Sequence, residues 1–317
     1  MEKRNIGWVI MALVAPLNLC TTHACDELTA VASIKESNLF MRCIKEFDKY
    51  FSEQKECLSF ESKSDGSLVS NLEKKIENHF GEMMQEETPW ASFKGEEGYY
   101  HEAKITDGEN TYCWYVDPID GTISFRNDLD TFAFTLSLVK NREPLASLIY
   151  LPTKAQAYFA YKGQGAFCNN LLTGEENKLV IKDHPLERSH IVARSDDYAF
   201  KYLQRENMLS RCQDIPAIVR TYTDAFAYTQ VAAGKYKAKI DAAAALWDLY
   251  PVYLLTREAG GEFVIYLAEN PTSDLFCSCL AGPLQVINVI RSAVERESKA
   301  LTFVNQIPSL ELVECND

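Results

Sequence analysis

Behind its first 25 residues, the chain places apolar residues at helical spacing in two separate stretches. The first stretch predicts a helix over Asp26–Phe51, and the second predicts a helix over Asn71–Met84. From residue 112 the pattern changes to short runs of β-branched and aromatic residues between turn residues, which is typical of strands. These runs predict strands at Tyr112–Val116, Phe132–Val139, Leu145–Tyr150 and Ala157–Tyr161.

The second part of the chain alternates between helical and strand patterns. Glycines follow both of its clearest helical stretches, as expected at helix ends. The pattern predicts helices over Thr223–Ala233 and Asp248–Ala259 and a strand over Phe263–Tyr266. With a junction in the polar stretch Leu172–Pro185, we expect a mixed α/β protein. Its N-terminal α+β half would span 25–180 and its C-terminal α/β half 181–317.

The composition and net charge limit the classes of protein to which this chain can belong. The chain has 317 residues, enough for about two domains or one large one. A hydrophobic share of 47% and a charged share of 24% are those of a folded globular protein. The net charge of −13 argues against a nucleic-acid partner bound by phosphate neutralisation. An acidic protein can still bind a phosphate group when a metal ion supplies positive charge.

The N-terminal segment differs from the rest of the chain. Lys3 and Arg4 precede an apolar run over Ile6–Leu19, which is too short for a membrane span. Small residues at Thr22–Ala24 resemble a cleavage site, so residues 1–24 are a candidate signal peptide. This interpretation favours export to a periplasm or to the exterior. The alternative is a buried or interfacial N-terminal helix in a cytoplasmic protein.

The cysteines give no sign of a metal or redox centre. Ten are scattered along the chain without a CxxC pair, so a structural zinc site is not expected. Most lie among apolar residues, where cysteine acts as a small buried hydrophobe. We interpret Cys277 and Cys279 as thiols of a strand or loop.

Acidic residues gather in three segments: Gly95–Glu97, Asp117–Thr122 and Leu246–Asp248. The second follows a predicted strand, and its proline and glycine can turn two carboxylates into one pocket. Carboxylate oxygens from several segments suit a hard cation such as Mg²⁺. Taken singly, each segment has a plainer explanation. The first could be a solvated patch and the second a surface turn, while Asp248 could cap a helix.

Together and in this order, the three segments resemble the inositol monophosphatase-like superfamily of metal-dependent, lithium-sensitive phosphatases. The resemblance covers roughly Glu27–Ile290 and includes three further motifs: Lys63–Val69, Gly163–Phe167 and Glu258–Gly261. It implies a layered α/β/α/β/α sandwich of the inositol monophosphatase and fructose-1,6-bisphosphatase type. It also implies a homodimer that acts on a small phosphorylated metabolite.

The resemblance implies a metal site with two Mg²⁺ ions and leaves a third open. Glu96 would bind the first ion and Asp117 would bridge two. The implied ligands are Glu96, Asp117, the Ile119 carbonyl, Asp120 and Asp248. Glu97 and Glu73 would support them, and Glu73 stands where the family usually has the shorter Asp. That exchange leaves the third ion and the strength of lithium inhibition open.

The same resemblance implies the catalytic and substrate groups. The catalytic groups would be Thr122, Glu96 and Asp117, with Thr122 and Glu96 orienting and activating the attacking water. Backbone N–H groups of Gly121 and Thr122 would hold the phosphate. The implied substrate-binding residues are Asp120, Gly121, Thr122, Asp224, Ala225, Asp241 and Asp248. Asp224 could instead cap the helix that follows it.

The substrate expected from the motifs is histidinol phosphate. Arg220, Asp224 and Tyr228 fit an Arg-x-x-Gly-Asp-x-x-x-Tyr frame that is usual in histidinol-phosphatases, although Thr223 replaces the glycine. Two acids, Asp224 and Asp241, would suit a cationic leaving group. The first alternative is inositol-1-phosphate, whose hydroxyls could bond to the same acids. Further alternatives are a 3′-phosphoadenosine-type nucleotide and a non-catalytic relative or regulatory subunit.

Overall fold

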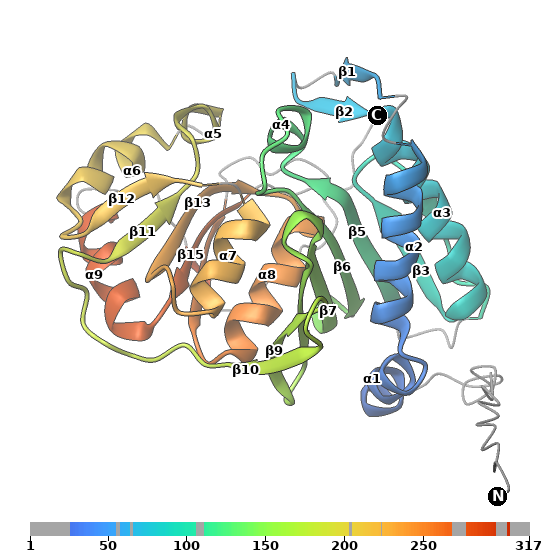
Figure 1. Ribbon diagram of the computed structural model, residues 1–317. Coiled ribbons are helices and arrows are strands. Elements are labelled where there is room, and N and C mark those ends of the chain that lie inside the picture. Colours follow the sequence, from blue (N-terminus) through green and yellow to red (C-terminus); the bar gives the residue numbers. More distant parts are fainter. Residues whose placement is uncertain are drawn as a thin grey trace, which may run out of the picture.

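Five alternating layers of helices and sheets, α/β/α/β/α, make up the protein (Figure 1), as the family resemblance implies. The computed structural model describes residues 26–54, 58–63, 66–105, 111–202, 205–222, 224–267, 277–295 and 303–304. The candidate signal peptide 1–24 lies outside these ranges. Within them, no helix is both long and apolar enough to cross a membrane.

The first layer contains α1 (Glu27–Glu36), α2 (Leu39–Gln54) and α3 (Asn71–Glu87). The single helix predicted over Asp26–Phe51 is therefore wrong, because the chain breaks between α1 and α2. At the break Asn38 has a φ of 54°, a left-handed conformation that interrupts a right-handed helix and that Asn tolerates well. The helix predicted to begin at Asn71 is confirmed.

The second layer is an eight-stranded sheet in the order β10-β9-β8-β7-β6-β5-β3-β4. Only the β3–β5 pair is parallel among its described neighbours. All four strands predicted between residues 112 and 161 are present in this sheet. The sheet consists of β3 (Ala91–Gly95), β4 (Tyr100–His101), β5 (Tyr112–Asp120), β6 (Ala133–Lys140), β7 (Glu143–Leu151), β8 (Gln156–Tyr161), β9 (Gly165–Asn170) and β10 (Glu175–Leu179).

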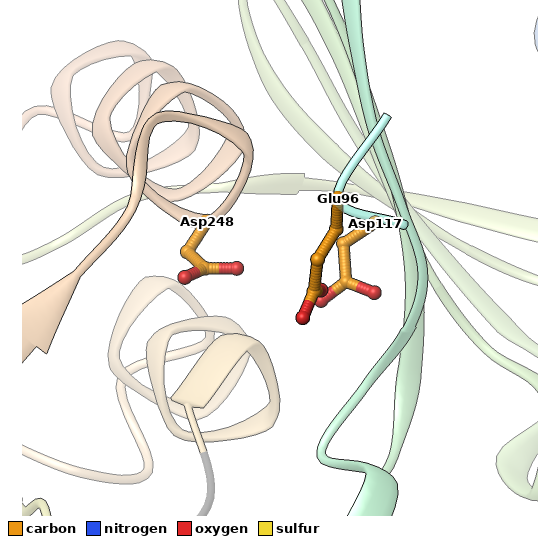
Figure 2. Close-up of side chains that lie close together, drawn as sticks. All are labelled: Glu96, Asp117 and Asp248. Carbon is orange, nitrogen blue, oxygen red and sulfur yellow. The ribbon is translucent and has the colours of Figure 1, made fainter. Parts of the chain in front are cut away.

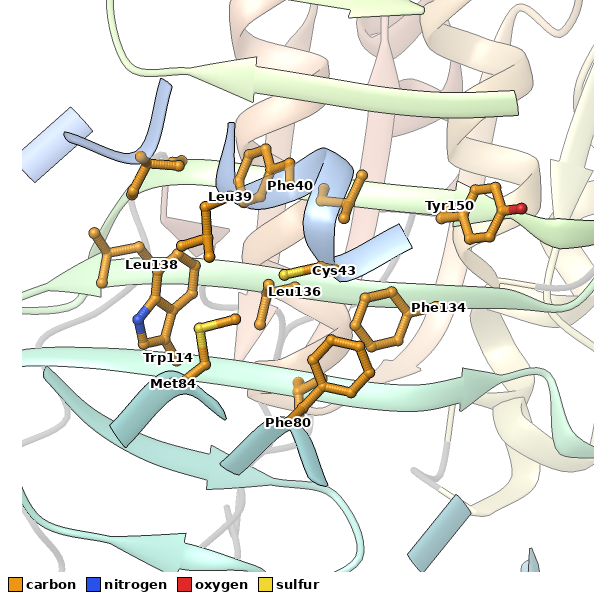
Figure 3. Packing of buried hydrophobic residues seen from close by; sticks show 14 of the residues in the cluster. Leu39, Phe40, Cys43, Phe80, Met84, Trp114, Phe134, Leu136, Leu138 and Tyr150 are labelled. Atoms are coloured by element: carbon orange, nitrogen blue, oxygen red, sulfur yellow. The ribbon is translucent and has the colours of Figure 1, made fainter. Parts of the chain in front are cut away.

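Aromatic and aliphatic side chains fill the space between these first two layers (Figure 3). The ring of Phe134 on β6 lies 5.1 Å from that of Phe47 on α2 and 4.8 Å from that of Phe80 on α3. Trp114 on β5 is fully buried, and its indole N–H donates to Thr88 Oγ1 at 2.8 Å. Burial of each such side chain stabilises the fold by about 1.5 to 3 kcal/mol.

The middle layer consists of α7 (Asp224–Ala232) and α8 (Leu246–Glu258), which pack between the two sheets (Figure 1). Helix α8 begins two residues before the predicted start. At its other end, the carboxylate of Glu258 accepts hydrogen bonds from the backbone N–H groups of Gly163 and Gly165, both at 2.7 Å. Helix α8 is thereby joined to the β8–β9 turn of the eight-stranded sheet.

The fourth layer is a six-stranded sheet in the order β12-β11-β13-β15-β14-β16. It consists of β11 (Ile191–Arg194), β12 (Ile218–Thr221), β13 (Ala238–Ala244), β14 (Glu262–Leu267), β15 (Cys277–Gly282) and β16 (Phe303–Val304). The fifth layer is formed by α5 (Asp197–Tyr202), α6 (Glu206–Arg211) and α9 (Leu284–Val294). Both Cys277 and Cys279 are buried thiols of strand β15, consistent with the prediction.

A short hairpin and a short helix lie above the ends of the eight-stranded sheet (Figure 1). Strands β1 (Phe60–Ser62) and β2 (Leu68–Ser70) form an antiparallel hairpin, and β2 leads directly into α3. Helix α4 (Thr122–Arg126) follows β5 after Gly121. The acidic segments predicted from the sequence converge in this region.

Candidate active site

Three carboxylates from three separate segments meet between the eight-stranded sheet and the start of α8 (Figure 2). They belong to Glu96, Asp117 and Asp248, and one oxygen of each lies within 4.8 Å of the others. The structure thus brings together three of the residues that the sequence predicts as metal ligands.

Asp117 is carried by an irregular part of β5. Asp117 pairs with Thr135 of β6, whereas Asp120 pairs with Ala133, so β5 has one extra residue between these two pairs. Such a bulge redirects side chains and is common beside active sites. Asp117 also accepts a hydrogen bond from the N–H of Ile119 at 2.8 Å, which fixes its carboxylate.

The protonation of Asp117 reflects its crowded surroundings. The residue is only 3% exposed, and this burial is the main cause that raises its pKa well above the usual range. The neighbouring carboxylates of Glu96, Asp120 and Asp248 raise the same pKa further. Like charges this close repel one another strongly in a buried setting. A cation among them would relieve that repulsion.

Glu96 sits in a tight turn after β3, and Glu77 of α3 holds this turn. The Glu77 carboxylate accepts from the N–H groups of Glu97 and Tyr99, both at 2.7 Å. A side chain at Gly95 would collide with it, because a Cβ built there lies 2.0 Å from Glu77 Cδ. Gly95 therefore lets α3 approach the turn that presents Glu96.

Lys63, from the loop between β1 and β2, reaches the edge of the acidic cluster. Its Nζ lies 2.8 Å from Glu96 Oε1 and 2.9 Å from Glu97 Oε1. The Glu97 side chain is almost completely buried, and that burial, followed by the charge of Glu96, raises its pKa to about 7. Lys63 opposes this effect and links the hairpin to the site.

Asp248 lies in the first turn of α8, where it bonds to the helix backbone and also belongs to the acidic cluster. One of its oxygens accepts from the N–H of Ala245 at 3.1 Å, so it caps the helix as the plainer interpretation expected. The residue is also part of the three-acid cluster, so capping and clustering occur together.

The next turn contains Pro251, which cannot donate to the Trp247 carbonyl. Thr135 Oγ1 donates to that carbonyl at 3.4 Å instead.

Thr122 and Glu73 form the shortest link across the site. Thr122 Oγ1 donates to Glu73 Oε1 at 2.6 Å and also lies 3.4 Å from the Ile119 carbonyl. The other oxygen of Glu73 accepts from the N–H of Ser70, which completes a capping box at the start of α3. Gly121 directly precedes Thr122 with a φ of 84°, a left-handed conformation that favours glycine.

The predicted substrate residues are placed in different ways. Asp120 is buried, and its Oδ2 accepts from the N–H of Ala225 at 3.0 Å, in the first turn of α7. An acid at this end of a helix is favoured by the helix dipole. Asp224 begins α7, but its side chain lies outside what the structure describes, so its role stays a prediction.

Asp241, the other predicted substrate acid, is only 2% exposed on β13. Its carboxylate accepts from Ser195 Oγ at 2.6 Å and from the Tyr228 hydroxyl at 3.2 Å. Tyr228 belongs to α7, one turn after the residue that bonds to Asp120. Asp241 is therefore connected to the acidic site through this helix.

Sequence reasoning did not identify Glu77 as part of the site. It follows Glu73 by four residues on α3, so both project from the same face of the helix. This four-residue spacing from Glu73 is the sequence feature that could have identified Glu77 as a site residue. The role of Glu77 depends on the N–H groups of a turn about twenty residues later, which no local pattern indicates.

The fold and this cluster define a family. A model of the inositol monophosphatase family matches residues 27–296, most of the chain. This protein belongs to the inositol monophosphatase family.

Individual relatives and solved structures carry several different names. The inositol-1-monophosphatase of Bacillus subtilis (strain 168) is 30% identical over 230 residues, which are 72% of this chain and 83% of that protein. The Nus factor SuhB of Pasteurella multocida (strain Pm70) is 26% identical over 210 residues, 66% of this chain and 76% of that one. The solved structure of an IMPase/NADP phosphatase complexed with Mg²⁺ and phosphate matches 86% of this chain and 98% of its own, with a TM-score of 0.65 and 19% identity.

Proposed function

We propose that this protein is a Mg²⁺-dependent phosphatase that hydrolyses a small phosphorylated alcohol, with an inositol monophosphate as the substrate. The observation that carries the proposal is the cluster of Glu96, Asp117 and Asp248 beside the Thr122–Glu73 pair. The family and the name of the Bacillus subtilis relative support it.

The donor set fits magnesium. Mg²⁺ binds oxygen ligands, and the cluster offers carboxylates from three segments within one small volume. Repulsion among them, seen in the raised pKa of Asp117, would be relieved by divalent charge. Glu96, Asp117 and Asp248 would hold the metal, with Asp120 and the Ile119 carbonyl as further ligands. We propose two ions and leave a third dependent on Glu73.

When bound, the metal supplies positive charge that activates water and stabilises the departing alkoxide. The Thr122 hydroxyl donates a hydrogen bond to the Glu73 carboxylate. The lone pairs of Thr122 Oγ1 can therefore accept a hydrogen bond from the attacking water. Glu96 would help orient the same water. The backbone N–H groups of Gly121 and Thr122 would bind phosphate oxygens, because Gly121 bends the chain there.

The leaving group is better described as inositol than as histidinol. The histidinol-phosphatase interpretation depends on the frame of Arg220, Asp224 and Tyr228 and on Asp241 as a second acid. The side chain of Asp224 is outside the described residues. The 30% identity to an inositol-1-monophosphatase favours the alternative. Lithium inhibition and a homodimer follow from the same family likeness and belong to this proposal.

A second candidate function comes from the relative named Nus factor SuhB. A protein of this fold could act through a partner rather than through catalysis. The carboxylate cluster favours catalysis, because a binding scaffold has no need to gather acids that repel one another.

The deciding experiment measures inorganic phosphate released by the purified protein. Inositol-1-phosphate, histidinol phosphate and a 3′-phosphoadenosine nucleotide are compared with Mg²⁺, with chelator and with added lithium. We expect Mg²⁺-dependent release, fastest from inositol-1-phosphate. Absence of release from all three would reject catalysis on these substrates, and light scattering of the same sample tests the dimer.

A further inference from the structure

A lysine is buried near Asp241, one of the acids predicted to bind substrate. Lys239 and Asp241 are two residues apart on β13, so their side chains project from the same face of the sheet. Lys239 is 0% exposed and Asp241 is 2% exposed. Burying a charged group is costly unless it is paired or hydrogen-bonded, so this pair of residues needs an explanation.

Ser195 connects the two charged groups. Its hydroxyl donates to Asp241 Oδ1 at 2.6 Å and accepts from Lys239 Nζ at 3.4 Å. The N–H of Ala242 also donates to Ser195 Oγ at 3.1 Å, which fixes the hydroxyl. One proton donor and two acceptor positions of a serine are thereby used. The result is a chain of hydrogen bonds from the ammonium to the carboxylate.

This network lies next to the catalytic region. Tyr228 donates to Asp241, and Ala225, one helical turn earlier on α7, donates to the site residue Asp120. One turn of helix rises only about 5 Å. Lys239 also donates to the Tyr222 carbonyl at 3.2 Å, in the segment that leads into α7. The network thus supports the end of α7 that faces the metal site.

We infer that the charge of Lys239, which Ser195 links to Asp241, offsets the charge of Asp241 and so selects a neutral hydroxylated leaving group over a cationic one. Lys239 is a positioning residue in this scheme, because its ammonium bonds to Ser195 Oγ and to the Tyr222 carbonyl. A cationic leaving group beside Asp241 would feel opposite effects from the two charges. A polyol would still use the carboxylate as a hydrogen-bond acceptor. The inference rests on the proposed function and names what sets its substrate class.

The experiment compares two phosphate esters on the full chain with Mg²⁺ present. Inositol-1-phosphate has a neutral leaving group and histidinol phosphate has a cationic one. The measured quantity is the ratio of kcat/KM for histidinol phosphate to kcat/KM for inositol-1-phosphate. Lys239→Met should raise this ratio about tenfold, because Asp241 is left uncompensated. Asp241→Asn should lower it by a similar factor, because Lys239 then repels a cation.

Two further variants separate charge from structure. The double variant Lys239→Met/Asp241→Asn has neither charge and should return the ratio to the wild-type value. Ser195→Ala keeps both charges and should raise the KM of both substrates while changing the ratio little. Thermal unfolding identifies any variant that fails to fold. If Lys239→Met does not fold, the inference is tested by the opposite shift of the kcat/KM ratio that we expect for Asp241→Asn.

The outcomes are distinct. An unchanged ratio in the folded single variants, while the wild-type protein hydrolyses inositol-1-phosphate, would overturn this inference alone. Equal ratio shifts in Ser195→Ala and Lys239→Met would assign Lys239 a purely structural role and also overturn it. If the wild-type protein releases no phosphate from either ester with Mg²⁺, the proposed function fails, and the inference fails with it.

Discussion

The hydroxyl of Thr122 lies 2.6 Å from a carboxylate oxygen of Glu73, although the two residues are 49 positions apart. Glu73 is itself held by the N–H of Ser70 at the start of α3. The first turn of α3 therefore orients a hydroxyl at the start of α4.

Removing the Thr122 hydroxyl should lower turnover without unfolding the protein. We expect Thr122→Ala to reduce kcat roughly 100-fold, because the attacking water loses an oriented acceptor. Thr122→Ser keeps the hydroxyl and should retain most of the activity. Phosphate release under saturating substrate measures both. Thr153→Ala, an exposed threonine, is the matched control, and a similar loss there would show a nonspecific effect.

Asp117 should be essential for metal binding. Chelator should abolish phosphate release, and added Mg²⁺ should restore it. Asp117→Asn removes one charge from the centre of the cluster, and we expect a loss of roughly 100-fold or more at moderate Mg²⁺. Asp48→Asn is the control, since Asp48 bonds to the Tyr150 hydroxyl instead. Near-normal turnover of Asp117→Asn would mean that the segment is only a turn.

A methyl group at Gly95 should disturb the turn that presents Glu96. Gly95→Ala must displace the Glu77 carboxylate from two N–H groups, and we expect it to lower the free energy of unfolding by about 1 to 3 kcal/mol. In a Glu77→Ala background the same change meets no carboxylate and should cost much less. A double-mutant cycle by chemical denaturation measures this coupling. Additive effects of the two changes would contradict the proposed contact.

Glu77 should make stability depend on pH. Burial raises the pKa of Glu77 to about 7 from a usual value of 4.5, although the N–H groups of Glu97 and Tyr99 lower it. Between these values the folded chain keeps a proton that the unfolded chain has lost. The free energy of unfolding contributed by Glu77 therefore falls as pH rises through this window and stays level above it.

Glu77→Gln removes that titration. Its free energy of unfolding should decline less between pH 4.5 and 7 than that of the wild-type protein, by on the order of 2 to 3 kcal/mol across the window. Denaturation series in chelator at several pH values measure the slopes. Glu82→Gln, an exposed position on the same helix, should leave the slope unchanged. Parallel curves for Glu77→Gln and wild type would disprove the assignment.

The sequence predicted features that depend on neighbouring residues better than contacts between residues far apart in the chain. Apolar periodicity located the strands because each strand is defined by its own residues. It did not locate the break at Asn38, which depends on one residue taking a left-handed conformation. Motif spacing identified Glu96, Asp117 and Asp248, since each comes from a short recognisable segment.

Contacts between distant segments were beyond that reasoning. The carboxylate of Asp120 turns toward α7, more than a hundred residues later, and Lys239 reaches a serine that precedes it by 44 positions. Both relations depend on how two sheets and the helices between them are stacked. Composition and local pattern carry no information on that stacking, so these partners became visible only in the folded chain.

Helix α8 is held at both ends by the other half of the molecule. Asp248 meets Glu96 and Asp117 at its start, and Glu258 receives two backbone N–H groups of the β8–β9 turn at its end. An inserted or deleted residue between these positions would rotate one end against the other by about 100°. The number of residues between the two acids therefore sets how the acidic cluster at one end of α8 is oriented relative to the β8–β9 turn at the other.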